Sequence, residues 1–573
     1  MNARLSSLFA VLVVFGLLLS ACAPAAAPTP APAAPQLQPP QLKPEGGNAA
    51  PAQPVQPAQP AMPAAPTNAA RATSAPAAEA PAAQAPAAGL QPPALQPPAD
   101  KQQAAPQPSA GQACCPPTPW PTYPPQREYT DSPFMDTRED HLSTFAMDVD
   151  TASYTKMRDY IRNGQLPPID LVRVEEYLNY FNYEYPDPES GAFSINIEGA
   201  PSPFGGEGTY MVKVGIQGKH IAGWQRKDAL LTFVIDVSGS MSEDNKMEMV
   251  KHGLTTLVDH LQANDRVAIV AFTDRAWTVI EPTSVENRNY ILSAINGLYP
   301  MNSTNTEAGL SLGYDLASRY YRDGAINRVI LATDGAANVG NTDPNVLAQY
   351  AQDWYGRNIF LSTIGVGRGN YNDQLLEQLA DKGNGVYSFL DNQQAAERIF
   401  AQDLTGSLQT IAKDSKIQVD FNPNVVRGYR LLGYENRAVA DSDFRNNAVD
   451  AGEVGAGHSV TALYEVQFNS EGGDEALIVR VRYEDPDTHA VTELNKPFKS
   501  GDFQRDFTRT SPRFQLAAAV AQFAEILRGN DWAKYEKMRD VASLVFNVQR
   551  ALPFDQDVSE FLGLVEQASR LTD

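Results

Sequence analysis

Four apolar runs between residues 228 and 390 constrain the fold of this chain more than any other feature of its sequence. Each run is almost continuously apolar, as expected of parallel strands that are buried on both faces of a sheet. The runs cover residues 230–236, 266–272, 328–334 and 359–367. Helical patterns lie between them at residues 246–261, 305–321 and 343–356. This alternation predicts a doubly wound α/β domain with a mainly parallel sheet over residues 228–395.

Oxygen-bearing side chains stand at the ends of two of these predicted strands. Asp236 ends the first run and Asp334 ends the third, and Ser238 and Ser240 follow Asp236 at every second position. In doubly wound sheets, ligands bind beyond the carboxyl ends of the strands, so we expect these residues to lie close together. Carboxylate and hydroxyl oxygens are ligands that Mg²⁺ accepts. The sequence therefore predicts a divalent-cation site at this edge of the sheet.

The stretch "DVSGSM" at residues 236–241 resembles the Asp-x-Ser-x-Ser motif of von Willebrand factor A domains. In that family the motif forms the metal-ion-dependent adhesion site (MIDAS), together with a Thr from a second loop and an Asp from a third. The matching residues here are Thr304 in "MNSTNTEAGLSL" and Asp334 in "VILATDGAANVG". The resemblance covers roughly residues 228–395. It implies a site for Mg²⁺, or for Mn²⁺ or Ca²⁺, and a protein partner that offers an Asp or Glu carboxylate to the ion.

The second loop departs from the family pattern. Many members carry Gly-Gly or Gly-Ser before the Thr, whereas this chain has Asn302 and Ser303. Thr306 is therefore an alternative ligand to Thr304.

The flanking regions extend the resemblance to about residues 140–570. The stretches "STFAMDVDTASYTKMRDYIRNGQLPPIDLVRVEEYLNYFNYEYP" and "GYENRAVADSDF…DAGEVGAGHSVTALYEV" are similar to the regions that bracket the A domain in a group of bacterial lipoproteins. That group is sometimes labelled calcium-activated chloride channel homologue. We expect an α+β region over residues 126–227 and a β-rich, then helical region over residues 396–573, with a helix at about 392–414. No segment here is long and apolar enough to span a bilayer, so the channel label carries little weight.

The first 21 residues predict an export signal with a short basic start and an apolar run that is too short to span a membrane. The run ends in "LSAC", which is similar to the lipobox of bacterial lipoproteins. The resemblance implies that Cys22 becomes a lipid-bearing N-terminus; a plain secretory signal is the alternative. We expect a protein that is exported and anchored by lipid to the cell membrane or outer membrane, facing the periplasm or the exterior.

Residues 22–125 are mostly Ala, Pro and Gln, and they predict a disordered, lipid-anchored tether. The tether holds Cys114 and Cys115, which could form bonds between molecules or remain free thiols. Its three basic and three acidic residues cancel, and Arg4 precedes it, so residues 126–573 carry a net charge of −23 within a chain of −22. A folded part this acidic argues against nucleic acid as a partner.

An enzyme is the main rival to a binding protein. The stretch "FAMDVDTAS" resembles the Asp-x-Asp strand end of haloacid dehalogenase-type phosphotransferases, with Asp148 as nucleophile and Asp150 as acid/base. That pattern needs Thr or Val at the position of Ala152. A simpler interpretation is that Asp150 or Thr151 caps the following helix.

We therefore expect no catalytic residues and predict a cell-envelope lipoprotein for metal-dependent protein–protein interaction, in adhesion or scaffolding. A structural envelope component with an idle metal site remains open.

Overall fold

The computed structural model describes residues 132–572, except 302, 336–339, 341–342, 368–372, 404–407, 450 and 470–473. All of these residues belong to one compact unit, Cys115–Asp573. The predicted export signal, Cys22, and the tether with Cys114 and Cys115 lie outside the described residues. Among the helices that are described, none has both the length and the apolar composition needed to cross a bilayer.

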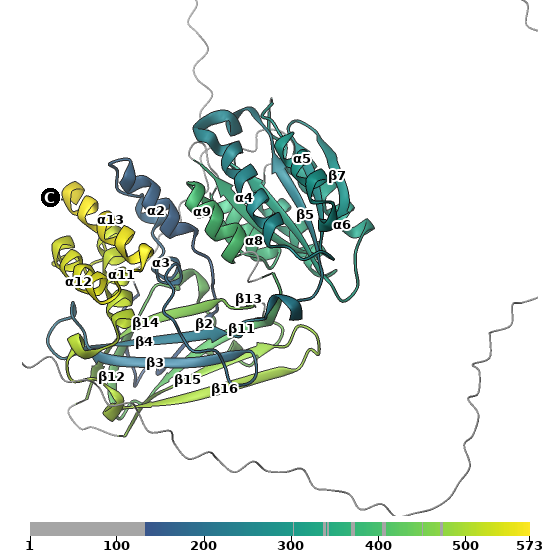
Figure 1. The fold of residues 1–573 in the computed structure, drawn as a ribbon. Coiled ribbons are helices and arrows are strands. Elements are labelled where there is room, and N and C mark those ends of the chain that lie inside the picture. Colours follow the sequence, from purple (N-terminus) through teal and green to yellow (C-terminus); the bar gives the residue numbers. More distant parts are fainter. Residues whose placement is uncertain are drawn as a thin grey trace, which may run out of the picture. The chain divides into compact units, whose positions relative to one another are not determined.

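The predicted α/β domain is built on a six-stranded sheet with the order β10-β9-β8-β5-β6-β7. Figure 1 shows this domain with β5 and β7 labelled. All neighbouring strands run parallel except β6 and β7. The sequence did not predict β7, which is antiparallel, or β10, which has four residues. The strands are β5 (Ala229–Asp236), β6 (Arg266–Phe272), β7 (Ala276–Ser284), β8 (Ile326–Thr333), β9 (Phe360–Val366) and β10 (Tyr387–Leu390).

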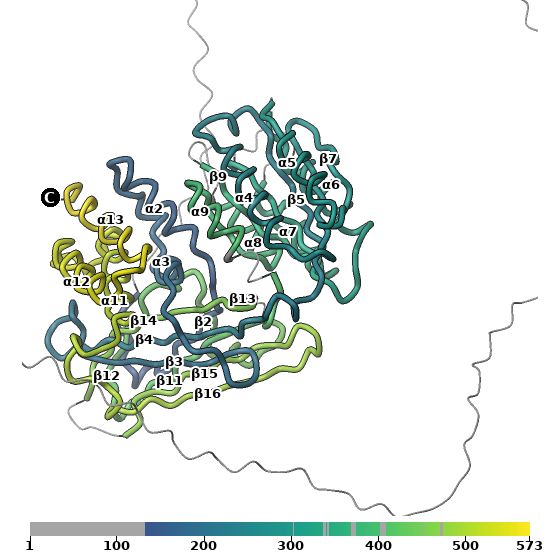
Figure 2. Tube along the Cα trace, viewed as in Figure 1, coloured from purple at the N-terminus to yellow at the C-terminus, as the bar shows by residue number. Residues whose placement is uncertain are grey.

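Helices cover both faces of this sheet because both faces of its central strand are apolar. In β5, Phe233 and Ile235 pack into one hydrophobic cluster with α4, α5 and α9, whereas Val234 packs into another with α6, α7 and α8. The helices are α4 (Lys246–His260), α5 (Arg288–Asn296), α6 (Thr306–Arg319), α7 (Pro344–Tyr355), α8 (Asp373–Lys382) and α9 (Gln393–Glu397). The doubly wound fold is therefore confirmed, and Figure 2 shows its chain path.

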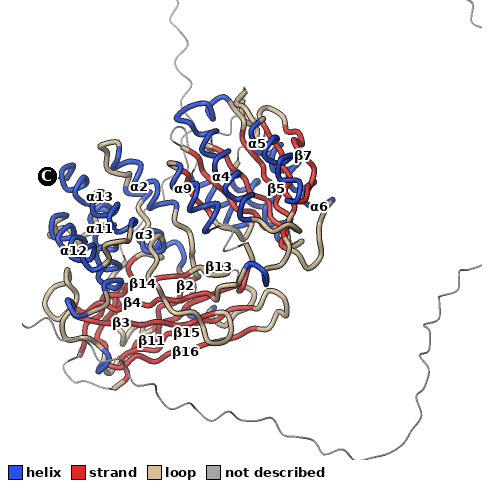
Figure 3. The backbone as a smooth tube through the Cα atoms, in the orientation of Figure 1, coloured by secondary structure: helices blue, strands red, loops and turns tan. Residues whose placement is uncertain are grey.

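The two flanks of the α/β domain form one β-sandwich (Figure 3). Strand β4, before the domain, pairs with β14, after it, and β2 pairs with β11 in the same way. The sheets have the orders β1-β12-β14-β4-β3 and β13-β11-β15-β16, and they share a hydrophobic core. Their strands are β1 (Met135–Asp136), β2 (Leu142–Ala146), β3 (Phe193–Pro201), β4 (Thr209–Gly218), β11 (Thr410–Phe421), β12 (Val426–Leu432), β13 (Gly452–Gly455), β14 (Ser459–Phe468), β15 (Glu475–Glu484) and β16 (Val491–Lys499).

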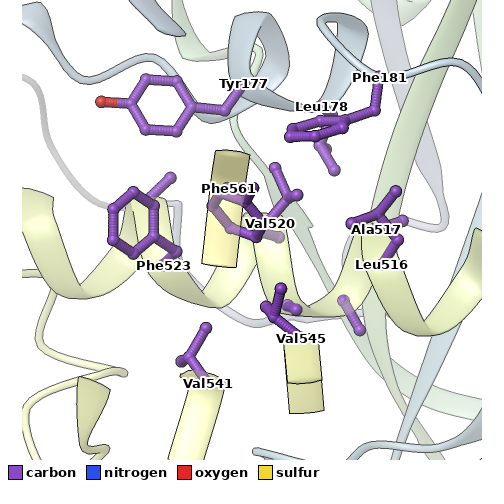
Figure 4. Packing of buried hydrophobic residues seen from close by; sticks show 14 of the residues in the cluster. Tyr177, Leu178, Phe181, Leu516, Ala517, Val520, Phe523, Val541, Val545 and Phe561 are labelled. Carbon is purple, nitrogen blue, oxygen red and sulfur yellow. The ribbon is translucent and has the colours of Figure 1, made fainter. Parts of the chain in front are cut away.

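Helices from both flanks share a further core, shown in Figure 4. Tyr177 and Phe181 from the N-terminal flank pack with Val520, Phe523 and Phe561 from the C-terminal flank. These helices are α2 (Ala152–Arg162), α3 (Val174–Asn179), α11 (Pro512–Arg528), α12 (Met538–Ala551) and α13 (Gln556–Thr572). The α/β domain is thus inserted between two halves of a single flanking body.

Two secondary-structure expectations differ from the structure. The helix expected at about 392–414 is wrong, because α9 ends at Glu397, a π-helical segment covers Arg398–Asp403, and β11 begins at Thr410. Strand β11 pairs with β13, β15 and β2, so tertiary pairing overrides the local helical pattern. Helix α12 was not predicted.

The 3₁₀ turns are η1 (Ile169–Leu171), η2 (Gly223–Gln225), η3 (Gly239–Asn245), η4 (Val285–Asn287), η6 (Glu435–Arg437), η7 (Asp441–Asp443), η8 (Ser500–Asp502) and η9 (Phe507–Arg509).

Candidate metal centre at the carboxyl edge of the parallel sheet

Asp236 is the last residue of β5, and its side chain is fully buried. Its Oδ1 accepts a hydrogen bond from the backbone N–H of Ser238 at 2.8 Å, and its Oδ2 accepts one from the Thr333 hydroxyl at 2.6 Å. Burial raises the pKa of this carboxyl to about 6, although both hydrogen bonds act in the opposite direction. The carboxylate is therefore held in a fixed orientation at a site where a compensating positive charge is favourable.

The first loop brings the two serine hydroxyls together. The Oγ atoms of Ser238 and Ser240 lie 3.0 Å apart, Ser238 is buried, and Ser240 is half-buried. Both residues lie where β5 ends and the 3₁₀ turn η3 begins. The structure thus brings the two hydroxyls into contact with each other, directly after the strand that ends in Asp236.

The second loop is tied to the same edge by its backbone. The N–H of Met301 donates to the carbonyl of Val237, and the N–H of Asn305 donates to the carbonyl of Thr273, both at 2.6 Å. Between them lies Thr304, which is buried. The alternative ligand, Thr306, is also buried and is the first residue of α6. Asn302 lies outside the described residues.

The third loop meets the second. A Cβ on Gly340, whose φ is +79°, would lie 2.5 Å from Oδ1 of Asn305. That same Oδ1 caps α6 by accepting the N–H of Ala308 at 3.0 Å. A glycine at this point therefore allows the third loop to approach the capped start of α6.

Asp334 follows β8 and pairs with a residue that the sequence analysis missed. The ammonium of Lys246 lies 3.0 Å from Oδ2 of Asp334, and the two side chains are 1% and 4% exposed. Lys246 is the first residue of α4, and its aliphatic chain packs against Gly367, after β9. A lysine at the start of an amphipathic helix gives no sequence signal of burial, so only the tertiary structure reveals this pair.

The donor set fits a divalent cation of the Mg²⁺ type. It consists of three hydroxyls and two carboxylates, which are hard oxygen ligands. Within the described residues, no group of three or more His, Cys, Asp or Glu side chains is arranged to hold a metal. A cation at this edge would therefore depend on the hydroxyls. The candidate ligands are Asp236, Ser238, Ser240, Thr304 and Asp334.

The aspartates of the rival enzyme site lie elsewhere, after β2. Asp148 and Asp150 are 5% and 3% exposed, and the Arg437 guanidinium lies 3.3 Å and 3.5 Å from their carboxylates. Oδ1 of Asp150 accepts the N–H of Tyr387 from β10 at 2.9 Å. Thr151 occupies the N-cap position of α2, but its side chain makes no capping hydrogen bond, so the predicted cap bond is absent.

Three family models match this chain. The model described as von Willebrand factor type A domain matches residues 231–402. The model described as von Willebrand factor matches residues 125–212, and the one described as Uncharacterized protein YfbK, C-terminal, matches residues 406–571. The first model covers the α/β domain, and the other two cover most of the flanking body.

The chain is also similar to individual known proteins. The Escherichia coli (strain K12) protein YfbK is 33% identical over 472 residues, with 78% of this chain and 81% of YfbK covered. The Synechocystis protein sll0103 is 33% identical over 173 residues, which cover 30% of this chain and 40% of that protein. A solved von Willebrand factor type A structure from Catenulispora acidiphila matches with a TM-score of 0.41 and 17% identity, covering 65% of this chain and 89% of that one. The chain belongs to the family of bacterial proteins with a von Willebrand factor type A domain that includes YfbK.

Proposed function

We propose that this protein is a cell-envelope lipoprotein whose A domain binds a divalent cation and captures a protein partner through it. The observation that carries the proposal is the set of oxygen side chains at the carboxyl edge of the sheet. Asp236 is fully buried there, and the paired hydroxyls of Ser238 and Ser240 come directly after the strand that it ends. Mg²⁺ is the cation that this donor set suits best, with Mn²⁺ or Ca²⁺ as alternatives.

The protein's own residues would set the strength and selectivity of this site. Hydrogen bonds from the Ser238 N–H and the Thr333 hydroxyl orient the Asp236 carboxylate before any cation arrives. The three hydroxyl ligands are neutral, so the ligand set adds little negative charge. When bound, a divalent cation supplies an electrophilic centre that an Asp or Glu carboxylate from a partner can complete. We therefore expect capture of a protein partner with an exposed acidic residue.

The N-terminal sequence supports the envelope setting. Lipid on Cys22 would anchor the chain to a membrane, and residues 23–125 would separate the A domain from it. A random coil of that length spans about 60 Å, whereas a fully extended one would reach on the order of 300 Å. Such a tether would let the A domain search for partners away from its anchor. Cleavage and acylation at Cys22 can be tested by mass spectrometry of the membrane fraction.

Calorimetry on the purified full chain tests the metal site directly. Mg²⁺ or Mn²⁺ should bind the wild type, and Asp236→Ala should abolish this binding. Asp315→Ala is the control, because Asp315 is an acidic residue that is 61% exposed and lies toward the end of α6 away from Thr306. Equal metal binding by the wild type and Asp236→Ala would contradict the proposed site.

Capture of a partner needs a second experiment. Envelope proteins retained by the wild type in Mg²⁺ should be released by EDTA and should not be retained by Asp236→Ala. If EDTA does not release the retained envelope proteins, the result would instead favour a structural envelope component with an idle metal site.

The structure offers no support for the phosphatase alternative. A nucleophilic carboxylate must be free to attack, whereas the Asp148 carboxylate is paired with the Arg437 guanidinium, which lies 3.3 Å away. Asp148→Asn should leave partner capture unchanged. Loss of hydrolysis of a generic phosphate ester in this variant would revive the enzyme hypothesis.

A further inference from the structure

A polar cleft of about 760 Å³ lies beside the A domain, between its helices α7 and α8 and the flanking body. The flanking body contributes residues 146–150, which begin at the end of β2, and described residues from 436, in η6, to 453, in β13. Its lining therefore comes from three separated parts of the chain. None of the five candidate metal ligands lines this cleft.

The lining is acidic. Among the described residues of the lining there are five carboxyl groups, against the two basic groups of Lys382 and Arg437. Arg437 is already engaged, because its guanidinium lies 2.9 Å from Asp381, 3.3 Å from Asp148 and 3.5 Å from Asp150. The single positive charge of Arg437 is thus shared among three carboxyl groups. The cleft would attract a further positive charge and disfavour an anion. The five acidic residues are Asp148, Asp150, Asp381, Asp443 and Glu453.

Several buried acceptor atoms of the lining lack hydrogen bonds. Oε1 of Gln378 in α8 and Oδ1 of Asn436 in η6 are buried and have no hydrogen-bond partner. Oδ2 of Asp148 also accepts none, because Arg437 Nε, 3.3 Å away, is not placed to donate to it. Buried polar atoms in native proteins are nearly always satisfied, so these oxygens indicate a missing donor. All three oxygens belong to residues that line the same cleft.

We propose that this cleft is a binding site for an organic cation with several N–H donors, namely an amine or guanidinium group. Such a group provides both features that the lining requires, positive charge and hydrogen-bond donors. It also forms charge-assisted hydrogen bonds, which are the strongest kind that carboxylates make. The volume accommodates a molecule much larger than a single ammonium ion. The cation belongs either to a free polyamine or to a basic side chain of another protein.

The geometry disfavours other ligand classes. No aromatic side chain stands among the lining residues that the structure describes, so a flat ring would find no stacking partner there. Three oxygens without donors and an excess of carboxylates argue against phosphate or sulfate, which offer acceptors themselves. A compact metal ion is also disfavoured, because the described residues contain no group of three or more carboxylate, imidazole or thiolate side chains suited to hold one.

Calorimetry with two probes tests the proposal on the purified full chain. Spermidine represents a free polyamine, and N-acetyl-argininamide represents a basic side chain. Titrations in 150 mM NaCl suppress general attraction to an acidic protein. EDTA in the buffer removes divalent cations, so that binding at the proposed metal site does not contribute to the measured heat. At least one probe should bind with a stoichiometry of one, and the tighter probe identifies the source of the cation.

Substitutions of Gln378 and Asn436 show whether the probe binds in this cleft. Gln378→Leu combined with Asn436→Leu removes the two amide acceptors that lack donors and should weaken binding of the probe at least tenfold. Asn436→Asp adds a carboxylate and should tighten it severalfold, a gain that misfolding cannot produce. Asp315→Asn, on the exposed side of α6, should change nothing. A cleft that holds only water would bind neither probe, and equal weakening by Asp315→Asn would reveal nonspecific attraction; either result overturns the proposal.

Discussion

At the scale of single residues, burial of charge is the main feature of this protein. Lys246 and Asp334 are paired at 3.0 Å and nearly inaccessible, in contact with the proposed metal site. Glu175 of α3 is also buried, and its Oε2 accepts the N–H of Tyr434 at 3.0 Å. Such groups destabilise the fold when they carry a charge that is not compensated. Each of the two gives a prediction at this scale.

Lys246→Met should tighten binding of a divalent cation while lowering the melting temperature of the metal-free protein. The ammonium compensates Asp334 when no cation is present and repels a cation when one binds. Replacing it with an uncharged chain of similar length leaves the Asp334 carboxylate without this partner. Calorimetry and thermal melting with and without Mg²⁺ check both effects. Unchanged affinity together with an unchanged melting temperature would show that the pair has no role at the site.

Glu175→Gln should flatten the dependence of stability on pH. Burial, with Glu435 and Asp148 nearby, raises the pKa of Glu175 from 4.5 to about 8. The folded state therefore holds a proton that the unfolded state has released, so stability falls as pH rises from about 4.5 to 8. The variant should be more stable at pH 8 by on the order of 4 kcal/mol. Urea unfolding at pH 5 and pH 8 measures this, and parallel curves for both proteins would contradict it.

At the scale of elements, close backbone contacts hold the flanking sheet together. Strand β13 begins at Gly452, which pairs with Ser415 of β11. A Cβ at Gly452 would lie 1.8 Å from the carbonyl oxygen of Met147, just after β2. The contact joins a strand from the C-terminal flank to the chain of the N-terminal flank. Only glycine allows these two backbones to come so close.

Gly452→Ala should destabilise the protein by on the order of 3 kcal/mol, because neither backbone can move without breaking strand pairing. Gly206→Ala is the matched control, since a Cβ there would meet no atom within 4 Å. Urea unfolding of both variants provides the comparison. Equal stability of the two would show that the sheet adjusts freely at β13.

At the scale of the whole molecule, ion pairs connect the A domain to the body in which it is inserted. Arg158 of α2 pairs with Asp391, which follows β10, at 2.7 Å, and both side chains are 2% exposed. Arg173, just before α3, pairs with Glu377 of α8 at 2.6 Å. The contact between the two bodies is thus partly polar and buried. Its stability depends on the pairs remaining complete.

Arg158→Met should destabilise the whole chain by about 3 kcal/mol, because it leaves the buried Asp391 with only the half-exposed Arg162 guanidinium, 3.9 Å away. Adding Asp391→Leu should restore much of this loss, since the unpaired charge is then removed. A double-mutant cycle in urea measures the coupling between the two side chains. Additive effects of the two substitutions would mean that the pair does not couple the A domain to the flanking body.

Local sequence patterns determined the A domain and the candidate ligands. Continuous apolar runs predict buried parallel strands, and such strands bring Asp236 and Asp334 to one edge. The sequence also predicts the N-cap of α7, because Asp343 stands directly before Pro344. In the structure, Oδ1 of Asp343 accepts the N–H of Asn345, as expected of an N-cap residue. These features depend on residues that are neighbours in sequence or on the geometry of a regular sheet.

Only the tertiary structure decided the rest, because it depends on contacts between distant residues. The pairing of β4 with β14 and of β2 with β11 joins segments on opposite sides of an inserted domain, and alternation within a strand does not specify its partner. The burial of Lys246 against Asp334 and the acidic cleft around Arg437 arise in the same way. Sequence periodicity reports which face of an element is apolar, whereas the environment of a polar side chain is set by whatever the fold places opposite it.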